Sequence, residues 1–224
     1  NRIDDFGGYK NFVNRYCAGQ NEASNLKELN YMLWKNCMFR REKSLVLTDL
    51  PDKIRQVNTC EITNRKEYMD AERDLIQYLQ MYKDADDEKI ERAMRGEVMV
   101  RINILRQVSA RGKIRDAAEF VKDFRENGQK IILFCSLHDV VDELKRYFPT
   151  AVSVTGRDSQ DEKQHAVDRF QNDPKVDVII CSIKAAGVGL TLTASSNVAF
   201  IEFPWTYADC CQCEDRAHRI GQKN

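Results

Sequence analysis

The side chains best suited to binding phosphate lie close together near the end of the chain. Gln212, Arg216 and Arg219 are spaced i, i+4 and i+7, so on a helix they would share one face. Thr206 followed by Asp209 has the pattern of a helix-capping pair and predicts a helix that begins near the next residue. Because arginine offers a rigid fork of donors that fits phosphate oxygens, this face suits a polyphosphate.

The same stretch also has a plainer interpretation. Asp215 and Arg219 are four residues apart and would form an ordinary ion pair on a solvated helix. His218 falls away from the stripe of arginines, which favours a structural role for its ring.

A second stretch with binding potential covers residues 182–193, directly after a predicted strand. In open α/β sheets, ligands bind at the carboxyl ends of strands. Gly187 and Gly189 would let the backbone approach a ligand, while Ser182 and Thr191 supply hydroxyl groups. A tight turn from strand to helix is equally expected for a Gly-Val-Gly sequence.

Two features that usually hold a nucleotide are absent from the sequence. It has no G-x-x-x-x-G-K-[ST] loop, and no acidic box follows a hydrophobic strand to hold Mg²⁺. We therefore expect no metal site, and we expect the chain to offer arginines to a nucleotide that it does not hold alone.

Composition narrows the classes of partner. The 224 residues, 42% of them hydrophobic, suffice for one large domain or two small ones. Basic and acidic side chains number 35 each, which argues against a uniformly basic surface for nucleic acid and leaves only a local patch. No apolar run reaches the length of a membrane span, and the N-terminus lacks a signal-peptide pattern, so no membrane partner is expected.

The eight cysteines are irregularly spaced, which predicts reduced thiols in an intracellular protein, either cytoplasmic or associated with the nucleus or nucleoid. Cys210, Cys211 and Cys213 invite a zinc interpretation, but no second pair of ligands is visible. The chain begins without Met and stops within what looks like a motif, so we expect a piece of a longer protein.

The hydrophobic pattern changes character near Gly112. Before it, apolar residues recur at helical spacing after Ser24, after Asn64 and beyond the acidic turn at 84–88, so residues 1 to about 110 read as helical. After it, apolar runs at 130–135, 151–154, 176–181 and 198–203 alternate with helical patterns near 114–127, 137–147 and 160–171. Strands that are apolar throughout and alternate with helices imply an α/β fold with a parallel sheet covered on both faces.

Four blocks in this second region resemble the second RecA-like lobe of the Swi/Snf-type DNA translocase ATPases, a branch of the superfamily-two helicases. The blocks are residues 132–136, residues 154–156 with 169–171, residues 182–193, and residues 212–222. The last block, which contains Asp-Arg-Ala-His-Arg-Ile-Gly-Gln, is the most specific to the family.

The helical region shares the resemblance. Residues 39–43 and 50–53 are similar to the family's RR-x-K and LP-x-K segments, in the helical protrusion that joins the two lobes. The sequence of residues 185–194 is similar to that of the annealing-helicase-like subgroup of the family. The resemblance implies a helical protrusion over residues 1–111 and a RecA-like lobe over residues 112–224, truncated at its C-terminal end.

The resemblance also implies roles. Arg216 and Arg219 would be arginine fingers that reach the γ-phosphate, and Gln212 would couple the nucleotide to closure of the lobes. The nucleotide-binding residues would be Gly187, Gly189 and Thr191, and the DNA-binding residues would be Ser136, Gly156, Ser182, Lys184 and Trp205. A buried aromatic that closes the end of the sheet is an equally expected role for Trp205.

ATP and Mg²⁺ would be held mainly by an N-terminal RecA-like lobe of the same protein, and double-stranded DNA would bind through its phosphate backbone. Three departures from the family pattern concern DNA contacts: Lys163, Lys184 and the Thr206-Tyr207 pair.

The leading hypothesis from the resemblance is the C-terminal lobe of a DNA-dependent ATPase that is inactive alone. A non-catalytic interaction module on a degenerate scaffold is the main alternative, and a small-molecule transferase would need a nucleotide-binding loop that the sequence lacks.

Overall fold

The chain divides into two units, Asn1–Asp49 and Leu50–Asn224, in a computed structural model. The structure describes residues 2–19, 22–80, 96–186 and 189–222. The boundary expected near Gly112 falls within the second unit, at the turn between two helices.

The first unit is a small helical subdomain. Its elements are η1 (Arg2–Phe6), α1 (Tyr9–Tyr16), α2 (Leu26–Asn36) and α3 (Lys43–Val46). The ring of Tyr16 is buried against Phe6 and Phe12, and its hydroxyl donates to Glu28 over 2.9 Å. Helix α2 confirms the helical spacing that follows Ser24.

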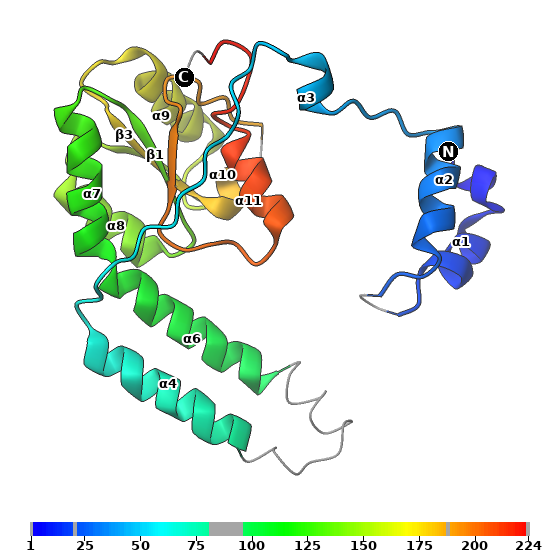
Figure 1. The fold of residues 1–224 in the computed structure, drawn as a ribbon, viewed down its shortest axis with the longest axis horizontal. Coiled ribbons are helices and arrows are strands. Elements are labelled where there is room, and N and C mark those ends of the chain that lie inside the picture. The colour runs from blue at the N-terminus through cyan, green and yellow to red at the C-terminus, as the bar shows by residue number, and fades with distance from the viewer. Residues whose placement is uncertain (1, 20–21, 81–95, 187–188, 223–224) are drawn as a thin grey trace. The chain divides into compact units, whose positions relative to one another are not determined.

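A four-stranded parallel sheet forms the centre of the second unit (Figure 1). The strands are β1 (Ile131–Cys135), β2 (Val152–Val154), β3 (Val178–Ser182) and β4 (Asn197–Phe200). Their order across the sheet is β2-β3-β1-β4, and every pairing is parallel. All five residues of β1 and of β3 are buried, as the continuous apolar runs predict for strands covered on both faces.

Helices cover both faces of this sheet. The helices are α7 (Ile114–Glu126), α8 (His138–Tyr147), α9 (Gln160–Asn172), α10 (Ile183–Ala186) and α11 (Tyr207–Glu214). Leu133 of β1 packs in the core cluster of α7 and α8, whereas its neighbour Phe134 packs in the cluster of α9 and α11. Figure 1 shows α7 and α11 on opposite sides of the strands. The predicted α/β class is confirmed.

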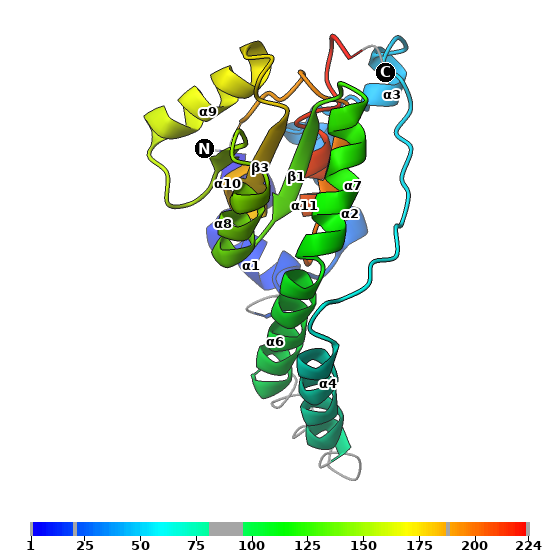
Figure 2. The ribbon, with the colours of Figure 1, turned by 90° about the vertical axis from the view of Figure 1, so that its left-hand side faces the viewer.

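A pair of antiparallel helices precedes the sheet. Helices α4 (Arg65–Gln80) and α6 (Glu97–Gly112) lie side by side in both views (Figures 1 and 2). Asn64, directly before α4, donates from Nδ2 to the Val108 carbonyl over 2.9 Å and to Glu67 over 3.0 Å. It therefore ties the start of one helix to the end of the other.

Residues 51–62 lie outside any helix, between the helical patterns expected after Ser24 and after Asn64. Tertiary contacts replace the hydrogen bonds of a helix in this segment. The Glu61 amide donates to Asp116 Oδ2 over 2.7 Å, and just beyond it the Thr63 amide donates to the Gly112 carbonyl over 3.0 Å. Pro51, which has no amide hydrogen, also disfavours a helix.

Gly112 has no side chain, and the chain at residues 62–64 packs directly against it. A substitution at Gly112 therefore tests this packing. A Cβ atom at this position would lie 2.0 Å from Asn64 Oδ1 and 2.9 Å from Ile62 Cβ. We expect Gly112→Ala to lower the free energy of unfolding by about 1–3 kcal/mol, because the chain at 62–64 must shift. Urea unfolding measures this change in stability. Gly156→Ala is the control, because nothing lies within 4 Å of a Cβ atom at position 156. Equal stability of the two variants would contradict the packing.

Candidate functional site

The helix that precedes the two arginines is shorter than predicted. It begins at Tyr207, and Thr206 caps it by accepting from the Asp209 amide over 3.1 Å, as predicted. It ends at Glu214, however, so the prediction that Gln212, Arg216 and Arg219 share a helical face is wrong. Both arginines follow the helix in a segment of turns.

Turn bonds and a tertiary hydrogen bond follow the end of the helix. The Arg216 and Ala217 amides donate to the carbonyls three residues earlier, over 3.0 and 3.1 Å. In a continuing helix the Arg216 carbonyl would accept from residue 220. It accepts instead from the Leu192 amide over 2.9 Å. Arg219 Nε donates to the backbone carbonyl of Asp215 over 3.1 Å, while the Asp215 carboxylate pairs with Lys53.

Residues 215–222, which we call the arginine segment, are hydrogen-bonded to the loop after α10. Arg219 Nη1 donates to Thr191 Oγ1 over 2.8 Å, so a predicted catalytic residue contacts a predicted nucleotide-binding residue. The side-chain amide of Gln222 donates to the carbonyls of Thr193 and Ser195 over 3.1 and 2.8 Å. The blocks at residues 182–193 and 212–222, joined by residues 28 apart in sequence, therefore form one structural unit.

The three predicted catalytic side chains differ in exposure. Gln212 is exposed, whereas Arg216 and Arg219 are half-buried. Gly189 is exposed and has φ +56°, a conformation that favours glycine, while Gly187 lies outside the described residues. The arginines are thus partly fixed by the fold and partly accessible, as groups that meet a ligand must be.

The cysteines around α11 behave as core residues. Cys210 and Cys213 are buried, and burial raises the pKa of Cys213 to about 12. A thiol with so high a pKa stays protonated near neutral pH and packs as a small hydrophobic group. Within the ranges that the structure describes, no group of three or more His, Cys, Asp or Glu side chains is placed to hold a metal ion.

Four of the predicted DNA-binding residues follow the carboxyl ends of parallel strands. Ser136 comes directly after β1, Gly156 comes after β2, and Ser182 and Lys184 lie at the end of β3. Because parallel strands end at the same edge of a sheet, the fold brings these residues to one edge. Ser136, Gly156 and Lys184 are exposed there.

Ser182 differs from its neighbours at this edge. Its side chain is buried, and Oγ accepts from the Ala185 amide over 3.3 Å. The hydroxyl thus caps the short helix α10, which gives Ser182 a structural contact that the sequence did not predict.

Glu202 is a buried acid that sequence reasoning missed. It lies two residues beyond β4, and its Oε1 accepts from the amides of Ser136 and Leu137 over 2.8 and 3.3 Å, at the start of α8. A carboxylate is favourable at the N-terminus of a helix, so Glu202 fixes the backbone of Ser136. The signal available in the sequence was a lone acid inside the apolar run at 198–203.

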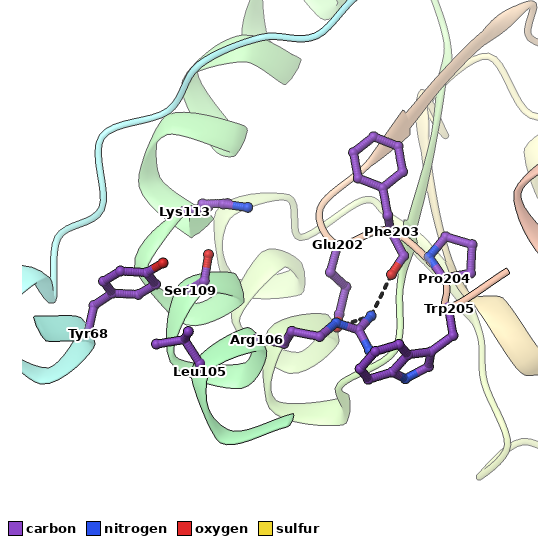
Figure 3. A pocket seen from close by; sticks show the side chains of 9 residues that line it. All are labelled: Tyr68, Leu105, Arg106, Ser109, Lys113, Glu202, Phe203, Pro204 and Trp205. Atoms are coloured by element: carbon purple, nitrogen blue, oxygen red, sulfur yellow. Dashed lines mark hydrogen bonds and ion pairs between the residues drawn. The ribbon is translucent and has the colours of Figure 1, made fainter. Parts of the chain in front are cut away.

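An open pocket of about 340 Å³ lies between the α4–α6 pair and the chain after β4 (Figure 3). Tyr68, Ser109 and Lys113 line one wall. On the other wall the Arg106 guanidinium lies 4.2 Å from the centre of the Trp205 ring and donates to the Phe203 carbonyl. Trp205 is 55% exposed, so the alternative of a buried aromatic closing the sheet is wrong.

Comparison with known proteins identifies the family. Residues 112–221 match the helicase conserved C-terminal domain. The human DNA annealing helicase and endonuclease ZRANB3 is 32% identical over 97% of this chain. A Caenorhabditis elegans homologue of the SWI/SNF-related regulator of chromatin subfamily A-like protein 1 is 32% identical over 98% of it. The chain belongs to the Swi/Snf family of helicase-like ATPases. The human relative, which is named as an annealing helicase, agrees with the expected similarity to the annealing-helicase-like subgroup.

This Swi/Snf chain covers 21% of the human relative and 33% of the worm relative, so it spans at most about a third of their length. Solved structures of ATPase domains share its fold. The C-terminal part of the Fun30 ATPase domain is 18% identical, with a TM-score of 0.66 over 78% of this chain and 83% of that one. The Sulfolobus solfataricus SWI2/SNF2 ATPase core is 24% identical, with a TM-score of 0.61 over 98% of this chain and 48% of that one. Among the described residues, no helix is long and apolar enough to cross a membrane.

Proposed function

We propose that this chain is the arginine-donating lobe of an ATP-driven translocase on double-stranded DNA. One observation carries the proposal: in a helicase C-terminal domain, Arg216 and Arg219 lie on a non-helical segment that is bonded to the loop of Thr191. A polyphosphate bound against this segment would meet both guanidiniums. The complete protein would hydrolyse ATP as two lobes close on each other, and it would step along DNA as they open and close.

In this proposal ATP and Mg²⁺ are held mainly by an N-terminal RecA-like lobe of the same protein. Arg216 and Arg219 act as arginine fingers that stabilise the charge developing on the γ-phosphoryl group, an effect worth about 10³–10⁵ in rate. Gly187, Gly189 and Thr191 shape the edge of the nucleotide site, and the exposed amide of Gln212 couples the nucleotide to lobe closure. The Arg219–Thr191 hydrogen bond supports this by holding one guanidinium before ATP arrives.

We assign DNA binding to the carboxyl edge of the sheet. Exposed Ser136, Gly156 and Lys184 would contact phosphates there, Ser182 would hold the backbone of the loop, and exposed Trp205 would lie at the groove. Phosphate contacts carry no sequence information directly, so binding would be salt-sensitive and largely indifferent to sequence. Such a protein would act where DNA is, in the nucleus or nucleoid.

The test is ATP turnover by the complete protein. We expect double-stranded DNA to stimulate hydrolysis, and we expect the 224-residue chain alone to show neither ATPase activity nor tight ATP binding, because it lacks a phosphate-binding loop. Lys184→Ala in the complete protein should weaken DNA binding about equally for all sequences and should reduce the salt slope by about one.

The control is Lys122→Ala, which removes an exposed lysine on α7. Two results would refute the proposal: ATP hydrolysis by the isolated chain, or an ATP turnover rate of the complete protein that does not change when DNA is added.

A further inference from the structure

A short non-helical segment lies against the end of α11, where the arginine segment begins. We call residues 51–55 the strap; it belongs to the second unit and lies in the cyan trace that leads to α4 in Figure 1. Its sequence resembles the LP-x-K block, which the sequence placed in the helical protrusion. The structure instead puts its side chains against the end of α11.

Three residues of the strap contact the residues on either side of Arg216. Lys53 Nζ donates to Glu214 Oε2 over 3.0 Å and to Asp215 Oδ1 over 2.7 Å. Arg55 forms a two-pronged pair with Glu214, with donor–acceptor distances of 2.8 and 2.7 Å. The ring of His218 lies 2.7 Å from the Pro51 carbonyl through Nε2.

These ion pairs are better shielded than ordinary surface pairs. The side chains of Lys53 and Glu214 are 23% and 12% exposed, although that of Arg55 is 50% exposed. The Arg55 guanidinium lowers the pKa of the Glu214 carboxyl, with help from Lys53 and against partial burial. Burial disfavours the charged form of Lys53, but hydrogen bonds to Asp215 and Glu214 raise its pKa overall. All three groups therefore stay ionised near neutral pH.

The arginine segment needs such contacts because the helix ends before it. Beyond Glu214 the backbone bonds are a mixture of helical and tighter turn bonds, and on one side the Leu192 amide donates to the Arg216 carbonyl. The strap holds the other side, at Glu214 and Asp215 before Arg216 and at His218 after it. Arg216 thus projects from a backbone fixed at both flanks.

We propose that Lys53 and Arg55 are positioning residues that hold the arginine segment in the geometry that catalysis requires. The inference rests on the proposed function, since it concerns when the arginines are correctly placed rather than whether they act. Small misplacements of a catalytic group are costly, because about 1 Å can reduce a rate 10²-fold. The strap also leads directly to α4, so it links the helical pair to the arginines.

The test uses the complete protein and separates placement from binding. We expect Lys53→Ala to lower kcat for DNA-stimulated ATP hydrolysis about tenfold or more, with KM for ATP and the affinity for DNA changed less than about twofold. Lys53→Arg, which keeps a cation of similar reach, should restore most of kcat. Lys53→Ala combined with Glu214→Gln should cost less than the sum of the two single losses, since both act through one contact.

Lys122→Ala serves as the matched control, and the thermal midpoint of each variant checks folding; Lys53→Gln replaces Lys53→Ala if that variant unfolds. If Arg216→Ala and Arg219→Ala lose activity while the Lys53 variants keep full kcat, the strap proposal is wrong and the arginine fingers stand. If the arginine variants keep full activity, the proposed function itself is wrong. A loss of DNA affinity equal to the loss of kcat would also overturn the positioning role.

Discussion

Arg216→Ala and Arg219→Ala are each expected to reduce kcat of DNA-stimulated ATP hydrolysis by the complete protein about 10³-fold or more. The reason is that a guanidinium placed at the γ-phosphoryl group stabilises charge that appears only in the transition state, so its loss falls on kcat rather than on ATP binding. Arg219→Ala also breaks the hydrogen bond to Thr191. Steady-state turnover with saturating DNA measures both effects.

Two variants serve as controls for this prediction. Arg146→Ala removes an arginine that is 77% exposed and pairs with Glu143 on α8, and it should leave turnover unchanged. Arg216→Lys keeps the positive charge but loses the planar fork, so it should recover only part of the rate. If either alanine variant turns over ATP at the normal rate, that arginine is not a finger.

Phe134→Ala is expected to lower the free energy of unfolding by about 3–5 kcal/mol. Phe134 is fully buried in β1, and its ring stacks on Phe200 with 5.3 Å between ring centres. Its removal leaves a cavity between the sheet and the helices α9 and α11. Because whole domains are stable by only about 5–15 kcal/mol, this loss would be a large share of the total.

Urea unfolding of the 224-residue chain measures this loss. Phe203→Ala is the matched control, because Phe203 also stacks on Phe200, at 5.7 Å, but is 60% exposed. It should cost about 1 kcal/mol or less. A small loss for Phe134→Ala would mean that the core of this face is not packed as the structure shows.

The strands and the helices of the RecA-like lobe were predictable because they follow from local patterns. The apolar run that became β1 differs from the structure by one residue, and Ser159 with Glu162 forms a capping box at the start of α9. Hydrophobic periodicity and caps are properties of neighbouring residues, so a sequence displays them directly.

The candidate site was predictable in its residues but not in its geometry. Continuing α11 to Arg219 was wrong: the chain turns after Glu214, and Leu192, far away in sequence, donates to the Arg216 carbonyl. The roles of Lys53 and Glu202 were missed for the same reason, since their partners lie 161 and 66 residues away. Long-range hydrogen bonds leave no periodic trace in a sequence, whereas a resemblance to a family indicates which residues matter without showing what each one contacts.

The most direct test of the central claim is the affinity of the complete protein for a transition-state mimic, ADP with aluminium fluoride, in the presence of DNA. The account predicts that the double variant Arg216→Ala, Arg219→Ala binds this mimic at least about 10²-fold more weakly than the wild type, while its affinity for ADP alone is unchanged. Equal affinity of the two proteins for the mimic would contradict the claim that this lobe completes the site of phosphoryl transfer.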